Sequence, residues 1–116
     1  MPTFFLSYAD ADRPRIEKVI AELRQRGEVT NDDEFTDWNR IPETGQGARA
    51  DLKHAIAEAS KLVVLWGDAA EQSAHVNYEA GLASAFDKPI VFVLPRGRKT
   101  RLPTELSDRP VIHLRG

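Results

Sequence analysis

Hydrophobic residues along the chain gather in four short runs, at residues 4–6, 62–66, 90–94 and 111–112. The second and third runs are continuous rather than alternating, which is typical of strands buried on both faces of a parallel sheet. A weaker strand is expected around residues 34–38. The pattern therefore predicts five short strands, at least two of them fully buried.

Apolar residues recur at helical spacing in three of the segments between these runs. The three stripes are Ile16, Val19, Ile20 and Leu23; Leu52, Ala55, Ile56 and Ala59; and Val76, Ala80, Leu82, Ala83 and Phe86. Asp12 is expected to cap the first helix, with Pro14 in its first turn and Gly27 just past its end.

Strands that alternate with helices imply right-handed crossovers and a sheet covered on both faces. We therefore predict an α/β fold, a flavodoxin-like three-layer sandwich whose five-stranded, mostly parallel sheet has the order 2-1-3-4-5. The length of 116 residues fits one domain, spanning 1–116.

Composition excludes several classes of protein. The chain has no cysteine, so disulfides, thiolate nucleophiles and zinc–thiolate sites are excluded, and a cytoplasmic location is expected. Its apolar runs are too short to cross a membrane. A net charge of −2 argues against direct nucleic-acid binding. The basic run at residues 96–101 is interpreted first as a solvated loop and second as a phosphate or partner contact.

The predicted strand order has its switch point between the first and third strands, and ligands of such sheets bind at the carboxyl ends of the strands. Residues 7–12 and 66–73 are delivered to that crevice. The long loops at residues 39–47 and 95–110 are further candidates for a functional role.

Glu79 is the main candidate for chemistry, because it lies on the same helical stripe as Leu82, Ala83 and Phe86. A carboxylate at the head of an apolar stripe is expected to be partly buried, which raises its pKa. From the pattern alone, a boundary glutamate with its carboxylate in water is the more common interpretation.

Other candidates have equally simple structural interpretations. Ser73 is either a helix cap or a ligand contact, and capping is the commoner role. His75 has no partner at metal-ligand spacing, so no metal site is expected. Trp38 and Trp66 suit the core, although Trp38 is better placed to stack on a ligand ring.

Taken together, these features resemble the Toll/interleukin-1 receptor (TIR) domain family. The residues that carry the resemblance are the opening Phe-Phe-Leu-Ser-Tyr-Ala with Asp12 five residues after Ser7, Asp37 eight residues before Gly45, the segment from 51 to 65, Ser73 with Glu79 six residues later, and the segment 102–106. The resemblance covers almost the whole chain. The family's usual Trp four positions before the glutamate is His75 here, and the final helix is missing or truncated.

The resemblance implies an NAD⁺ hydrolase or cyclase, because the family's signature glutamate is present. Glu79 would be catalytic, and NAD⁺ is then a substrate with no separate cofactor. The residues implied to line the nicotinamide–ribose pocket are Tyr8, Asp37, Trp38, Gly45, Ser73 and His75. The resemblance further implies self-association through TIR–TIR contacts, a C-terminal sensor domain or partner protein, and a role as an effector in defence or signalling.

A single carboxylate is sufficient for cleavage of the nicotinamide–ribose bond. Cleavage of the nicotinamide–ribose bond passes through an oxocarbenium-like state, and the nicotinamide leaves as a neutral molecule without a general acid. Two alternatives stay open. Residues 78–89 also resemble the glutamate segment of nucleoside 2-deoxyribosyltransferases, and a TIR domain can be a non-catalytic interaction module.

Overall fold

A computed structural model describes residues 3–41, 45–95 and 102–115. Its strands are β1 (Thr3–Ser7), β2 (Glu34–Thr36), β3 (Lys61–Leu65), β4 (Ile90–Leu94) and β5 (Val111–His113). Its helices are α1 (Ile16–Gln25), α2 (Ala48–Glu58), α3 (Asp68–Glu71) and α4 (Ala74–Ala85), with 3-10 helices η1 (Asp10–Arg15) and η2 (Thr104–Leu106).

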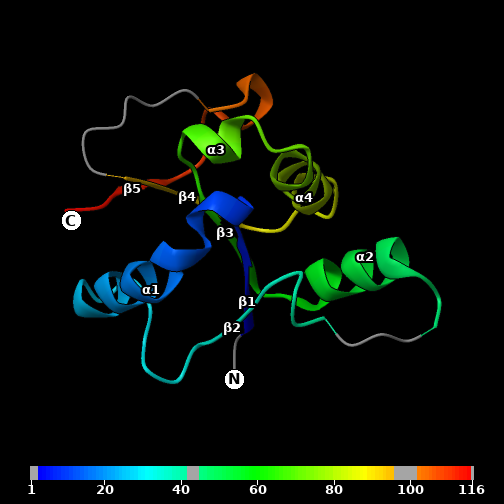
Figure 1. Ribbon diagram of the computed structural model, residues 1–116, viewed down its shortest axis with the longest axis horizontal. Coiled ribbons are helices and arrows are strands. Elements are labelled where there is room, and N and C mark those ends of the chain that lie inside the picture. Colours follow the sequence, from blue (N-terminus) through cyan, green and yellow to red (C-terminus); the bar gives the residue numbers. More distant parts are fainter. Residues whose placement is uncertain (1–2, 42–44, 96–101, 116) are drawn as a thin grey trace.

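The five strands form one sheet in the order β2-β1-β3-β4-β5, and all four pairings are parallel (Figure 1). The predicted fold class and strand order are therefore confirmed. β1 lies between β2 and β3, and its last residue, Ser7, is in register with Val64. The topological switch point falls at the carboxyl ends of β1 and β3, as the sequence predicted.

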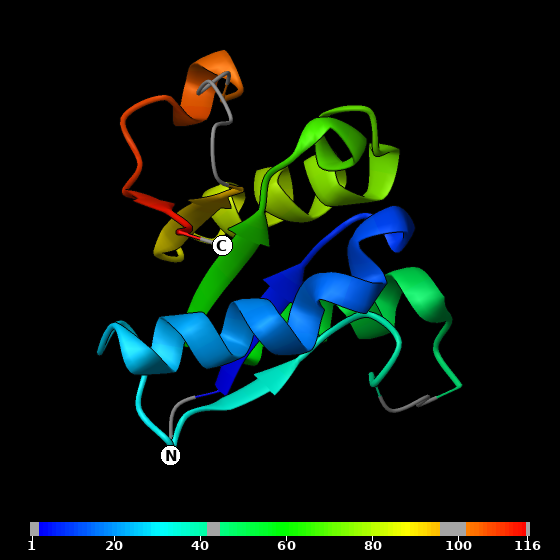
Figure 2. The ribbon, with the colours of Figure 1, turned by 60° about the vertical axis from the view of Figure 1, so that its left-hand side comes forward.

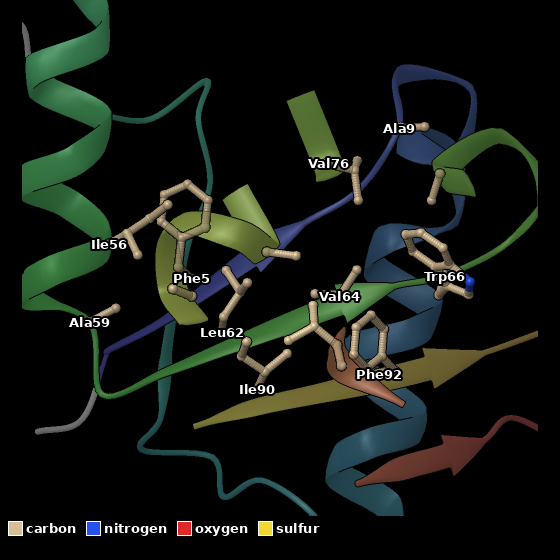
Figure 3. Packing of buried hydrophobic residues seen from close by; sticks show 14 of the residues in the cluster. Phe5, Ala9, Ile56, Ala59, Leu62, Val64, Trp66, Val76, Ile90 and Phe92 are labelled. Atoms are coloured by element: carbon tan, nitrogen blue, oxygen red, sulfur yellow. The ribbon is translucent and has the colours of Figure 1, made fainter. Parts of the chain in front are cut away.

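Helices cover both faces of the sheet, with α1 on one side and α2 and α4 on the other (Figure 2). Alternate residues of a strand point to opposite faces. Accordingly, Phe5, Leu62 and Val64 pack with Ile56 of α2 and Val76 of α4 (Figure 3). Their neighbours along the strands, among them Phe4, Leu6 and Val63, pack against α1. Because both faces are buried, the central strands need the continuous apolar runs seen in the sequence.

The prediction that Asp12 caps the first helix is wrong. Asp12 lies inside η1, buried, and its side chain accepts no capping hydrogen bond. Pro14 lies inside η1 and contributes to the difference, because proline has no backbone N–H to donate an α-helical hydrogen bond. The α-helix therefore begins only at Ile16. Gly27 does follow its end and has the positive φ, 75°, that glycine adopts readily.

Candidate functional site

The core of the candidate site is a contact between β1 and α4. Ser7 ends β1 and shares a face with Phe5, so its side chain points toward the layer that contains α4. Its hydroxyl Oγ donates a hydrogen bond of 2.6 Å to Oε1 of Glu79. Both residues have no exposed surface. The other carboxyl oxygen, Oε2, has no hydrogen-bond partner among the described residues.

Burial dominates the electrostatics of Glu79. Loss of water raises the pKa of its carboxyl from 4.5 to about 7. The hydrogen bond from Ser7 and the nearby His75 lower this pKa, whereas the negative charge of Asp37 raises it. A carboxyl poised near neutrality, with one oxygen held and the other unpaired, is typical of a functional group rather than of a surface glutamate.

His75 lies one helical turn before Glu79 and is held at both ring nitrogens. Its Nε2 is 2.9 Å from the main-chain oxygen of Tyr8, and its Nδ1 is 3.0 Å from Oγ of Ser73. A carbonyl oxygen only accepts, so Nε2 carries hydrogen and donates to Tyr8. In the neutral ring, Nδ1 then accepts from the Ser73 hydroxyl. The ring is therefore fixed against the end of β1.

Ser73 has the helix-cap role considered for it, and its contact with a ligand stays a prediction. It is the residue before α4, and its Oγ accepts a hydrogen bond of 3.3 Å from the backbone N–H of Val76. This is an N-cap interaction. The same oxygen contacts His75. One side chain thus starts the helix and orients the imidazole that the helix carries.

A second polar contact joins the carboxyl ends of β1 and β2. The phenol of Tyr8 donates a hydrogen bond of 2.9 Å to Oδ2 of Asp37. The other oxygen of Asp37 accepts from the backbone N–H of Asn39, also at 2.9 Å. Burial and the bond to Asp37 raise the pKa of Tyr8. The segment after β2 is consequently anchored to the sheet where the site lies.

Two aromatic rings meet beside this contact. The ring centroids of Trp38 and His75 are 5.5 Å apart with an interplanar angle of 57°, and Trp38 is 38% exposed. Trp66, by contrast, is buried and packs edge-on against Phe92 in the core. Of the two tryptophans, only Trp38 is exposed, and its ring contacts His75, which lies one helical turn before Glu79.

The structure thus brings together six of the seven predicted site residues: Tyr8, Asp37, Trp38, Ser73, His75 and Glu79. Gly45 is exposed, with a φ of 85°, and no described contact connects it to the others. Sequence reasoning missed Ser7 as a site residue. The signal was present, because Ser7 is two positions from Phe5 on a buried strand and a polar side chain there needs a partner.

Within residues 3–41, 45–95 and 102–115, no three potential ligands gather into a metal site. None of the described helices is long and apolar enough to span a membrane. The basic run at residues 96–101 lies outside the described residues.

Comparison with known proteins places the chain in a family. Residues 4–116 match the TIR domain family model, and the chain therefore belongs to the TIR domain family. No curated protein sequence matches it.

Solved structures with a similar fold include a TIR domain and an N-glycosidase. One is the TIR domain of the Toll-related receptor TRR-2 from Hydra magnipapillata, at 14% identity and a TM-score of 0.70, with 95% of this chain and 82% of that chain covered. The other is the CMP N-glycosidase BcmB from Clostridium botulinum, at 21% identity and a TM-score of 0.56, with 97% and 87% covered. At these identities the likeness concerns the fold alone.

Proposed function

We propose that this TIR domain is an NAD⁺ glycohydrolase in which Glu79 is the catalytic residue. The observation that carries the proposal is the carboxyl of Glu79, buried at the carboxyl edge of the sheet with a pKa of about 7 and with Oε2 unpaired. Trp38 offers an exposed ring in contact with His75, which lies one helical turn before Glu79. Burying a carboxyl with one unpaired oxygen lowers the stability of the fold, and proteins usually keep such a group because it has a function.

The reaction breaks the bond between C1′ of the ribose and the pyridinium nitrogen of NAD⁺. The bonding electrons leave with nicotinamide, which departs neutral, and positive charge develops on the ribose. The ionised carboxylate of Glu79 faces this charge and stabilises it. Water then adds to C1′ and releases a proton, which gives ADP-ribose; attack by a group of the adenosine moiety instead would give a cyclic product.

Glu79 is completely enclosed in the present conformation. Substrate binding therefore requires that the side chains covering the carboxyl move apart. TIR domains generally self-associate, and we propose that packing against neighbouring copies favours the open arrangement. On this proposal the domain is a cytoplasmic effector that a sensor domain or partner protein activates by assembling it.

The test compares wild type, Glu79→Gln and Glu58→Gln in concentrated solution with NAD⁺, with the products resolved by chromatography. Glu58 is an exposed glutamate of α2 and serves as the matched control. We expect wild type and Glu58→Gln to release nicotinamide, and Glu79→Gln to be slower by roughly 10²–10³. Near-normal turnover by a folded Glu79→Gln protein would show that another group is catalytic.

A second candidate is cleavage of a nucleotide or deoxynucleoside at its N-glycosidic bond. It is favoured by the similarity in fold to a CMP N-glycosidase and by the position of Glu79 on α4. In that reaction the carboxylate would attack C1′ as a nucleophile. Offering CMP and deoxynucleosides in parallel with NAD⁺ separates the two enzymes. A protein that assembles but cleaves none of them is a non-catalytic interaction module.

A further inference from the structure

The end of β1 supplies Glu79 with a hydrogen-bond donor at only one of its two oxygens. Ser7 Oγ and Glu79 Oε1 are 2.6 Å apart, a short distance typical of a hydroxyl bound to a carboxylate. Oε2 is buried and unpaired among the described residues. The two oxygens of one carboxyl group therefore have different environments.

We infer that Ser7 is the positioning residue of the site: it holds Oε1 of Glu79 so that Oε2 is the oxygen left for the substrate. This inference rests on the function proposed above. On this inference, Oε2 of Glu79 is the oxygen that contacts the ribose hydroxyls or faces the positive charge that develops on the ribose. Ser7 itself does not contact the substrate.

The geometry of the sheet makes this contact rigid. Ser7 is the last residue of β1, which is paired on both sides, and Ser7 itself is in register with Val64 of β3. Glu79 lies in the middle of α4, a helix that begins at Ala74 and ends at Ala85. A carboxyl tied between a central strand and a helix cannot rotate freely, and such restriction is what a site on rigid elements requires.

The hydroxyl also acts on the charge of the carboxyl. A donor to a carboxylate favours the ionised form, and the bond from Ser7 lowers the pKa that burial has raised. The other groups that influence Glu79 are His75, from the same helix, which also lowers its pKa, and Asp37, after β2, which raises it. Ser7 thus favours the ionised form of the Glu79 carboxyl, in the same direction as His75.

The experiment uses Ser7→Ala, which removes a single oxygen, and Ser7→Thr, which restores a hydroxyl. Val63→Ala is the control for lost stability, because Val63 is buried on the opposite face of the sheet, against α1. For each protein, the Glu79 carboxyl carbon is titrated by ¹³C NMR, and kcat and KM for NAD⁺ are measured across pH.

In the Ser7→Ala protein, we expect the carboxyl of Glu79 to titrate at higher pH than in the wild type. Its kcat near neutral pH should fall about tenfold or more, with little change in KM. The acidic limb of its activity should move to higher pH, and Ser7→Thr should move it back. Val63→Ala should keep the wild-type titration and pH profile.

An unchanged Glu79 titration in Ser7→Ala, or a kcat within twofold of wild type at every pH, would overturn the inference. Failure of the proposed function is a different result. If the wild type released no nicotinamide from NAD⁺, the NMR titration in the same samples would still decide whether Ser7 holds Glu79.

Discussion

The phenol of Tyr8 and the carboxylate of Asp37 are joined by a 2.9 Å hydrogen bond between two buried side chains. Tyr8 follows β1 and Asp37 follows β2, so the bond fixes the ends of two neighbouring strands relative to each other. The main-chain oxygen of the same tyrosine binds His75. Tyr8 therefore connects the segment after β2 with the helix of Glu79, in addition to the ring contact between Trp38 and His75.

Removal of the Tyr8 hydroxyl should destabilise the protein. Tyr8→Phe keeps the ring but leaves Oδ2 of Asp37 without its buried donor, which costs about 1–2 kcal/mol. Tyr78→Phe is the matched control, since Tyr78 is 41% exposed. Thermal unfolding of the three proteins is the measurement. We expect a lower midpoint for Tyr8→Phe only; equal midpoints for both variants would show that the Asp37 contact contributes nothing.

Glu79 should make the stability of the fold depend on pH. Its pKa is 4.5 when unfolded and about 7 when folded, so the folded state holds the proton more tightly between these values. The contribution of Glu79 to the free energy of unfolding is therefore largest below pH 4.5. It falls by about 3 kcal/mol as the pH rises to 7.

Denaturant unfolding of the wild type, Glu79→Gln and Glu58→Gln between pH 4.5 and 8 checks this contribution. Glutamine does not titrate, so the component from residue 79 should vanish in Glu79→Gln and persist in Glu58→Gln. The same pH dependence in all three proteins would mean that Glu79 titrates like an exposed glutamate.

The layout of the fold was predictable because it follows from hydrophobic patterning. Continuous apolar runs such as residues 90–94 occur where both faces of a strand are buried, and this fixes a parallel sheet with helices on both sides. The local start of α1 was not predictable from Asp12 alone. Pro14 lies inside η1, α1 begins only at Ile16, and the side chain of Asp12 is buried instead of capping.

The site was predictable in its location but not in its contacts. The strand order implies that residues after β1 and β3 meet. It does not imply that Ser7 binds Glu79 72 residues away, or that His75 donates to the backbone of Tyr8, because such contacts depend on helix orientation and side-chain rotamers. The helical pattern predicted that Glu79 is partly buried, whereas in the structure it is completely buried.

Trp38 should contribute to substrate binding rather than to the chemical step. It is the exposed member of the ring pair with His75, and stacking on the nicotinamide ring is worth about 0.5–1.5 kcal/mol beyond the area buried. We expect Trp38→Ala to raise KM for NAD⁺ about threefold to tenfold and to change kcat less. Phe86→Ala removes a similarly exposed aromatic side chain from the end of α4 and should leave KM unchanged. An unchanged KM in Trp38→Ala would exclude Trp38 from the binding site.

Activity should depend on assembly, because Glu79 is enclosed in the single chain. We expect the rate per molecule to rise as the protein is concentrated, and a rate per molecule that is constant from dilute to crowded solution would contradict this. Mixing two variants, each expected to lose activity for a different reason, gives a sharper measurement. Glu79→Gln lacks the carboxylate, and Gly45→Ala forces a φ of 85° on a residue that disfavours it, in the loop after β2. If a neighbouring copy's loop completes the site, the mixture should regain part of the activity that neither variant has alone. If each chain completes its own site, the mixture should stay as inactive as its components.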